Sequence, residues 1–318
     1  MKITLLIPFL GKRPRDFEHF AYSASFVDAN FLFLSDDARS APSYPNFRVI
    51  PFNLSEFNAL ARNAVGCEIA SRDVAKICDF RPAFGLIFAH LLGGSDYWGY
   101  CDVDVLFGNV STYLRRDFLS RYDVLSLNAN YLSGSFTLWR NDADVNRLFE
   151  HSPEWKKLMA SPKLHAFDEC GHGLWGRLNA GESIFDIPVE FMSMTHVVRK
   201  LERDGRIRAH FRGLVKEVFA DDEVLKWTPG HVSTVGRQNA EEYAYFHSVL
   251  LKNLPTFYVP SWNPMPAEIF ISRSGYHRTL ASSISKTAQL RRIVQRKIRN
   301  LPGGLLRRIR AIAGNPAA

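Results

Sequence analysis

The chain has 318 residues, of which 46% are hydrophobic and 23% charged. This composition excludes a disordered, collagenous or small disulfide-rich protein and fits one large or two small globular domains. Its net charge of +8 is unevenly spread, because residues 1–268 hold 29 basic and all 32 acidic residues, whereas residues 269–318 hold 11 basic residues. We therefore predict a slightly acidic domain over residues 1–268 and a basic tail over residues 269–318.

The four cysteines, at positions 67, 78, 101 and 170, include no C-x-x-C pair. They predict reduced thiols in a cytoplasmic protein, and neither a disulfide framework nor a structural zinc site. The apolar run at the N-terminus is short and contains Pro8, so we expect a first strand there and no signal peptide. No apolar stretch approaches the roughly 18 residues that would span a bilayer.

Short apolar runs alternate with segments of helical periodicity, which indicates βα units around a mostly parallel, twisted sheet flanked by helices. In chain order, strands are predicted at residues 3–8, 30–34, 47–51, 97–101, 122–127 and 135–139. One helix is predicted at residues 82–92, started by Asp79 or by the step from Arg81 to proline and stopped by two glycines. A second helix is predicted from residue 142 to about residue 150.

The ends of the first two strands carry candidate nucleotide contacts. In an open α/β sheet, ligands bind outside the carboxyl ends of the strands. These ends hold Pro8, Phe9 and Gly11 after the first strand, and Asp36 and Asp37 after the second. No glycine-rich dinucleotide motif or P-loop follows either strand, which argues against a dinucleotide oxidoreductase and a P-loop NTPase. The alternative is that the two aspartates are turn residues.

Asp102 and Asp104 directly follow the apolar strand predicted at residues 97–101. Their spacing places both carboxylates on one face of an extended backbone. Two hard oxygen ligands on one face make half a site for Mg or Mn. An ion held there would neutralise the charge that builds up on a departing nucleoside diphosphate. The alternative is a pair of solvated turn aspartates.

Three charged residues, Lys76, Asp79 and Arg81, lie around the predicted start of the helix at residues 82–92. Asp79 could accept hydrogen bonds from sugar hydroxyls, while Lys76 and Arg81 could offset phosphate charge. Alternatively, Asp79 is only a helix cap and Arg81 only part of a surface ion pair.

The motif D-F-R-P, followed by an apolar helix and W-G-Y-C-D-V-D-V-L-F-G, resembles bacterial GT-A-type glycosyltransferases of polysaccharide and capsule gene clusters, a family known mainly as a domain of unknown function. It is also similar to the D-x-x-R core of retaining sugar transferases of the mannosyl and toxin type, although Asp79 and Arg81 are spaced here as D-x-R. The resemblance covers residues 1–255. It implies a GT-A-like single domain, a nucleotide-sugar donor that is UDP-linked, and Mn or Mg held by Asp102 and Asp104.

The resemblance also implies a later histidine in the metal shell. The best match is His247, with Lys252 following as a phosphate partner, and His231 is the competing candidate. The alternative for His247 is a packed or hydrogen-bonded histidine without a ligand.

Two further pairs are candidates for contacts with the substrates. Ser133 and Gly134 are expected to bring backbone close to the transferred sugar or the acceptor, unless they form only a tight turn. Asp168 or Glu169 could be the general base that deprotonates an acceptor hydroxyl. Asp168 could equally be the N-cap of a following helix.

In the basic tail, apolar residues at positions 290, 293, 294, 298 and 301 follow helical spacing among arginines and lysines. This predicts a basic amphipathic helix, which would attach the protein peripherally to the anionic cytoplasmic face of the inner membrane. The alternative is a helix whose apolar stripe packs on the domain. The tail has no aromatic residue after Tyr276, which argues against nucleic acid as a partner.

Together these features predict a metal-dependent glycosyltransferase that moves a sugar from its donor to a hydroxyl of a glycan or lipid-linked acceptor in surface polysaccharide synthesis. One alternative is a haloacid-dehalogenase-like phosphotransferase, but such an enzyme needs an aspartate at the end of the first strand, where Gly11 stands. Another is a non-catalytic membrane or nucleic-acid adaptor built on the tail. Retention or inversion stays open, because a base at Asp168 or Glu169 suits inversion and the similarity to retaining enzymes points the other way.

Overall fold

The structure is a computed structural model that describes residues 1–37, 42–70, 73–220, 222–236, 240–254 and 256–284, together with Leu290 and Val294. The chain forms two compact units. The first consists of Met1–Lys216, Pro229–Val232 and Glu242–His247. The second consists of Glu217–Thr228, Ser233–Glu241 and Ser248–Ala318.

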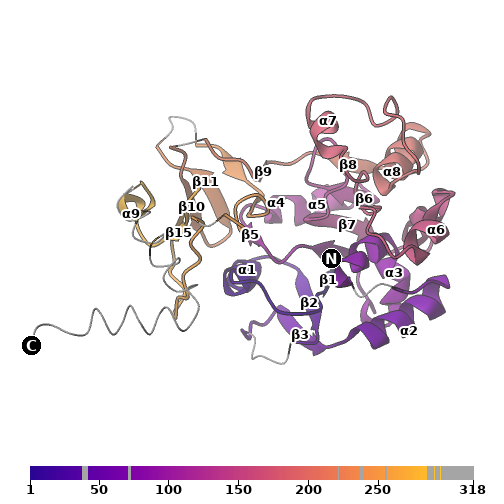
Figure 1. The fold of residues 1–318 in the computed structure, drawn as a ribbon, viewed down its shortest axis with the longest axis horizontal. Coiled ribbons are helices and arrows are strands. Elements are labelled where there is room, and N and C mark those ends of the chain that lie inside the picture. Colours follow the sequence, from indigo (N-terminus) through magenta and orange to yellow (C-terminus); the bar gives the residue numbers. More distant parts are fainter. Residues whose placement is uncertain are drawn as a thin grey trace, which may run out of the picture. The chain divides into compact units, whose positions relative to one another are not determined.

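A seven-stranded sheet forms the centre of the first unit (Figure 1). Its order is β3 (Phe47–Pro51), β2 (Asn30–Ser35), β1 (Ile3–Pro8), β4 (Tyr97–Cys101), β7 (Phe136–Arg140), β6 (Val124–Ser126) and β8 (Ala209–Phe211). The pairs β3–β2, β2–β1, β1–β4 and β6–β8 are parallel, and β7 runs antiparallel to both of its neighbours. The predicted α/β class with a mostly parallel sheet is therefore confirmed.

The strand predictions agree closely with the structure, because each strand is a short apolar run. Three of them have the predicted bounds, and β2 extends one residue further, to Ser35. The strand predicted at 122–127 is shorter, at Val124–Ser126, and the one predicted at 135–139 is shifted to Phe136–Arg140.

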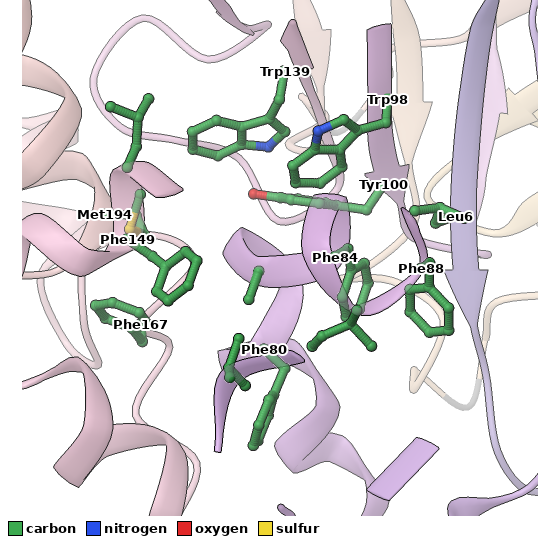
Figure 2. Close-up of a cluster of buried hydrophobic side chains, with 14 of the residues drawn as sticks. Leu6, Phe80, Phe84, Phe88, Trp98, Tyr100, Trp139, Phe149, Phe167 and Met194 are labelled. Carbon is green, nitrogen blue, oxygen red and sulfur yellow. The ribbon is translucent and has the colours of Figure 1, made fainter. Parts of the chain in front are cut away.

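The alternating side chains of the strands fill two hydrophobic cores, one on each face of the sheet. On β1, Leu6 belongs to one core, whereas Leu5 and Ile7 belong to the other. Figure 2 shows the first core, in which the rings of Trp98 and Trp139 stack at 5.8 Å. Burying such a large side chain stabilises the fold by roughly 2–3 kcal/mol, so these two layers fix the sheet and the loops at its edges.

Short helices cover both faces of this sheet. Helices that contribute to the core of Figure 2 are α2 (Leu54–Val65), α3 (Phe84–Ile87), α6 (Trp155–Ala160) and α8 (Met194–Arg203), with the 3-10 helices η1 (Val74–Ala83) and η3 (Val145–His151). Helices of the opposite core are α1 (Phe17–Ala24), α4 (Ser111–Leu114) and α5 (Arg116–Leu119). The remaining helices of the first unit are η2 (Ala89–Leu91) and α7 (Trp175–Asn179).

The single helix predicted at residues 82–92 is wrong. The segment is divided among η1, α3 and η2, and Pro82 lies inside η1, where a proline removes a backbone donor. Asp73, and not Asp79, caps η1 by accepting a hydrogen bond from the Ala75 N–H at 3.0 Å. The helix predicted to start at residue 142 is also different, because the structure has the 3-10 helix η3 at Val145–His151.

Two smaller sheets complete the described strands. One has the order β5 (Val105–Phe107), β13 (Tyr245–His247) and β9 (Val215–Lys216). The other has the order β12 (Glu242–Tyr243), β11 (His231–Thr234), β10 (Leu225–Thr228), β14 (Ile269–Ser272) and β15 (Gly275–His277). Helix α9 (Leu280–Ile284) follows β15.

The segment predicted as the basic tail, residues 269–318, begins with strand β14 at Ile269, and β15 follows at Gly275. The alternation of Ile269 and Ile271, both fully buried, makes this segment a strand. The amphipathic helix predicted over residues 286–301 lies outside the described residues, except for Leu290 and Val294, and its attachment to a membrane stays a prediction. No helix in the described part of the chain is long and apolar enough to cross a membrane.

Candidate functional site

The parallel strands β3, β2, β1 and β4 end at one edge of the central sheet, and Asp102 follows β4 directly. Because β7 runs the opposite way, the loop that precedes it lies at the same edge. The backbone N–H of Asp102 donates to the carbonyl of Ser135 at 3.2 Å, in continuation of the β4–β7 ladder. The edge expected to bind ligands thus carries the two aspartates.

His247 joins these aspartates through the small sheet. Strand β13 pairs antiparallel with β5, and His247 lies opposite Val105, next to Asp104. Its Nε2 is 3.4 Å from Oδ1 of Asp104 and 3.7 Å from Oδ2 of Asp102. The three residues, all in the first unit, offer ligand atoms that lie within 4.8 Å of one another.

This group has the donors of a divalent-cation site. Two ligands held at about 2.1 Å from one ion can be no more than about 4.2 Å apart, a limit that both His247–carboxylate distances meet. Two carboxylates and one imidazole suit Mn, and the carboxylates suit Mg. The side chains of Asp104 and His247 are only 5% and 7% exposed, whereas that of Asp102 is 30% exposed. A bound ion would therefore be reached from the side of Asp102.

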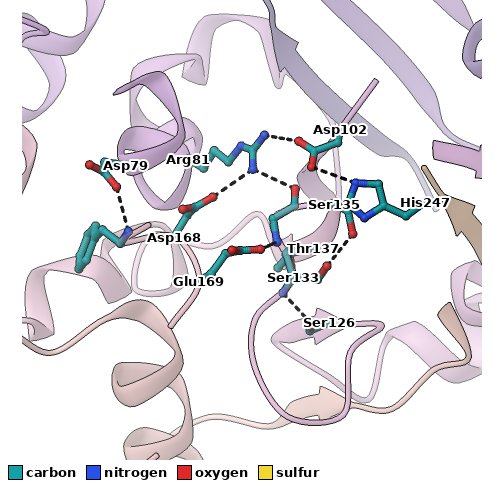
Figure 3. Close-up of polar contacts among 12 residues, drawn as sticks. Asp79, Arg81, Asp102, Ser126, Ser133, Ser135, Thr137, Asp168, Glu169 and His247 are labelled. Carbon is teal, nitrogen blue, oxygen red and sulfur yellow. Dashed lines mark hydrogen bonds and ion pairs between the residues drawn. The ribbon is translucent and has the colours of Figure 1, made fainter. Parts of the chain in front are cut away.

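Arg81 connects this group to a second pair of carboxylates (Figure 3). Its Nη2 donates to Oδ1 of Asp102 at 2.5 Å, and its Nη1 donates to Oδ2 of Asp168 at 3.0 Å. The same Nη1 donates to the carbonyl oxygen of Gly134 at 3.0 Å. The guanidinium also lies over the ring of Tyr100, 5.2 Å from its centroid. The alternative role of Arg81 in a surface ion pair is wrong, because its side chain is 13% exposed and joins two parts of the site.

Asp168 and Glu169 are neighbours in the sequence but have different partners, Arg81 for Asp168 and the loop before β7 for Glu169. Oε1 of Glu169 accepts the N–H of Gly134 at 2.6 Å, and its Oε2 accepts the indole N–H of Trp175 at 2.8 Å. Burial raises the pKa of the Glu169 carboxyl, against these two hydrogen bonds. Burial also raises the pKa of Asp168, against the attraction of Arg81. A carboxyl with a raised pKa is a better proton acceptor once it is ionised.

Lys76 and Asp79 do not reach the site surface. The Lys76 ammonium is fully buried and donates to Asp79 Oδ2 at 2.7 Å and to the carbonyls of Leu158 and Lys163 at 2.6 and 2.8 Å. Its three protons are thus engaged, so a contact with phosphate is incompatible with this geometry. Asp79 is equally buried, which excludes the predicted hydrogen bonds to sugar hydroxyls.

The loops after β1 and β2 are bound to each other. Asp36 accepts the N–H of Gly11 at 2.7 Å, and Asp37 accepts both the N–H and the Nε of Arg13. The Phe9 N–H donates to a carbonyl of β2 at 2.8 Å. The two aspartates therefore join the loops after β1 and β2. Contacts of this edge, Pro8 included, with a nucleotide stay a prediction.

The sequence analysis missed Ser135, in the loop before β7, and Tyr245, on β13. Ser133 and Ser135 hydrogen-bond through their hydroxyls at 2.7 Å, and Ser135 contacts the hydroxyl of Tyr245 at 2.7 Å. Tyr245 lies on β13, two residues before His247. Trp175, which holds Glu169, was missed as well, because no local pattern connects it with a residue six positions earlier.

The other predicted residues lie apart from this group or are not tested. His231 contacts Glu242, with Nδ1 2.5 Å from Oε1, and is not part of the Asp102–Asp104–His247 group. Lys252 belongs to the second unit, and its contact with phosphate stays a prediction. The four cysteines are free, as predicted. Burial raises the pKa of Cys78 and Cys170 to about 12, so both thiols stay protonated at neutral pH.

Several solved structures are similar to this chain. The galactosyltransferase LgtC in complex with donor and acceptor sugar analogs is 15% identical, with a TM-score of 0.33 over 54% of this chain and 72% of that chain. An active-site mutant of LgtC is 16% identical, with a TM-score of 0.32 over 54% and 71%. The glycosyltransferase GlyE of Streptococcus pneumoniae TIGR4 is 11% identical, with a TM-score of 0.28 over 70% of each chain.

No curated protein matches the sequence. A family model described as "Family of unknown function (DUF6625)" matches residues 5–261, which include every residue of the site described above. This agrees with the expected resemblance to a family known mainly as a domain of unknown function. The protein belongs to the DUF6625 family.

Proposed function

We propose that the protein is a metal-dependent glycosyltransferase of the GT-A type. It would take a sugar from a UDP-linked donor and transfer it to a hydroxyl of a glycan or lipid-linked acceptor in the synthesis of a surface polysaccharide. The observation that carries the proposal is the group of Asp102, Asp104 and His247 at the carboxyl edge of the sheet. A bound Mn or Mg would neutralise the diphosphate as it departs.

Residues around the metal group orient its ligands and offer a general base. Arg81 donates to Oδ1 of Asp102, and Oδ2 of the same carboxylate faces His247. Glu169 accepts two N–H donors, from Gly134 and from Trp175, and burial raises the pKa of its carboxyl. We propose that Glu169 or Asp168 is the general base that takes the proton from the hydroxyl of the sugar acceptor. The basic tail would keep the protein on the cytoplasmic face of the membrane, near lipid-linked acceptors.

A screen of nucleotide sugars by thermal unfolding tests the proposal. With Mn present, a UDP-sugar at a hundredfold excess over its Kd should raise Tm by about 5 °C. The same donor should give little or no shift in EDTA, because the diphosphate needs the cation. Release of UDP from the stabilising donor would then be measured. A set of donors that leaves Tm unchanged with Mn and Mg, at millimolar concentration, contradicts the proposal.

Replacement of Gly134 by alanine should lower the transfer rate by about a hundredfold. A Cβ at this position would lie 2.7 Å from Oε1 of Glu169 and 2.8 Å from Nη1 of Arg81, so both side chains must move. The rate of UDP release from the donor measures the effect. Gly93→Ala is the matched control, because a Cβ there meets no atom within 4 Å. Equal rates for the two variants would contradict a role of this loop in the reaction.

A further inference from the structure

We infer that Asp79, together with Lys76, is a positioning residue that clamps the turn at Ala166 and thereby directs Asp168 and Glu169 into the site. The inference rests on the proposed function for the catalytic role of Asp168 and Glu169. Its structural part, a strained turn fixed by a buried carboxylate, is independent of any substrate.

The carboxylate of Asp79 holds the turn on both sides. Its Oδ2 accepts the N–H of His165 at 2.9 Å, and its Oδ1 accepts the N–H of Phe167 at 2.9 Å. Ala166 lies between these two donors. Asp79 is thus connected to residues 86 and 88 positions away, and it is 0% exposed.

Lys76 pairs with this carboxylate inside the protein. A buried charge is strongly destabilising unless it is paired and hydrogen-bonded. The ammonium of Lys76 lies 2.7 Å from Asp79 Oδ2 and also binds the carbonyls of Leu158 and Lys163. The pair therefore ties η1 to the end of α6 and to the segment that leads to Ala166.

Ala166 is held in a conformation that its side chain disfavours. Its φ is +52°, and among the described residues it is the one non-glycine residue with positive φ. Such a backbone is strained and persists only where the surrounding structure holds it in place. The two hydrogen bonds that Asp79 accepts from His165 and Phe167 hold the backbone of Ala166 in this conformation.

The helix α8 fixes the far side of the same segment. The N–H of Met194 donates to the carbonyl of Phe167 at 2.9 Å, and the N–H and hydroxyl of Thr195 donate to the carbonyl of Glu169 at 2.9 and 2.7 Å. Because the backbone on both sides of Asp168 is bound in this way, its side chain is aimed at Arg81 and that of Glu169 at Gly134. Release of the turn should rotate both carboxyls away from these partners.

The test combines two substitutions. Asp79→Asn keeps the shape of the side chain but presents an amide N–H₂ to one of the two backbone donors and leaves Lys76 without its counter-charge. We expect kcat to fall by about tenfold or more, with the donor KM changed by less than about threefold. Ala166→Gly added to this variant should restore most of kcat, because glycine adopts positive φ without the clamp.

Two controls separate positioning from general stability. Ala180→Gly is the same substitution at a φ of −81° and should restore nothing. Asp123→Asn removes a carboxylate that binds the N–H of Arg208 at 2.8 Å, away from the site, so its effects should not be reversed by Ala166→Gly. Alone, Ala166→Gly should raise Tm by about 2 °C, whereas Ala180→Gly should not.

The outcomes are distinguishable. A Tm lowered by Ala166→Gly would overturn the inference without reference to any donor, since the turn would then not be strained. Loss of kcat in Asp79→Asn that Ala166→Gly fails to restore would also overturn it. If the wild-type protein turns over no nucleotide sugar, the proposed function fails, and the Tm comparison still decides whether the turn is strained.

Discussion

Replacement of Asp104 by alanine is expected to abolish metal binding at this site and to lower sugar transfer by about a thousandfold. The variant removes one of the three ligand atoms. Of the two carboxylates in the group, that of Asp104 is the more deeply buried. A cation at a departing diphosphate supplies several kcal/mol of stabilisation, and about 4 kcal/mol corresponds to a thousandfold in rate. The rate of UDP release at saturating donor and Mn measures the loss.

Metal binding is measured separately, by the electron paramagnetic resonance signal of free Mn during titration. Asp117→Ala is the matched control, since Asp117 lies in an exposed ion pair with Arg115, and both side chains are 67% exposed. An exposed pair of this kind contributes little to stability. A variant at Asp104 that binds Mn like the control, or that transfers sugar at the wild-type rate, would contradict the assignment of the site.

The parts of the fold and of the site that depend on residues close together in the sequence could be predicted. The strands are continuous apolar runs. The two carboxylates were expected on one face of an extended backbone, but Val103 and Asp104 form a turn between β4 and β5, and the group forms around that turn. Their position after β4 then follows from the edge rule for parallel sheets. His247 was assigned only through the resemblance, because its approach to Asp104 depends on the pairing of β13 with β5, more than 130 residues apart.

The parts that could not be predicted depend on distant contacts. Charged residues near a helix start are normally exposed, so Lys76 and Asp79 were expected to face a ligand. Their burial depends on carbonyls and N–H groups of residues 158–167, which no local pattern reveals. The positive φ of Ala166 has no sequence signal either, because alanine is not a residue that favours it.

Replacement of Arg81 by methionine is expected to affect both the folding free energy and the transfer rate, because this guanidinium is shared by Asp102, Asp168 and the carbonyl of Gly134. Methionine fills similar space but leaves two carboxylates without their counter-charge. Breaking a buried pair in this way costs about 3 kcal/mol of folding free energy, with the exposed part of Asp102 screened by solvent. We expect sugar transfer to fall by about a hundredfold, with Arg81→Lys little better, since one ammonium cannot span three acceptors.

The Arg81→Met variant should bind Mn more tightly than the wild-type protein, although it transfers sugar more slowly. At an effective dielectric constant of about 20, a guanidinium a few ångströms away opposes a cation by roughly 3 kcal/mol per unit of cation charge. Its loss therefore outweighs the roughly 1 kcal/mol of side-chain freedom that Asp102 regains. Tighter Mn binding together with slower transfer would show that Arg81 serves the reaction by orienting carboxylates, at the expense of metal affinity. Weaker binding, or transfer at the rate of the surface control Arg115→Met, would contradict this role.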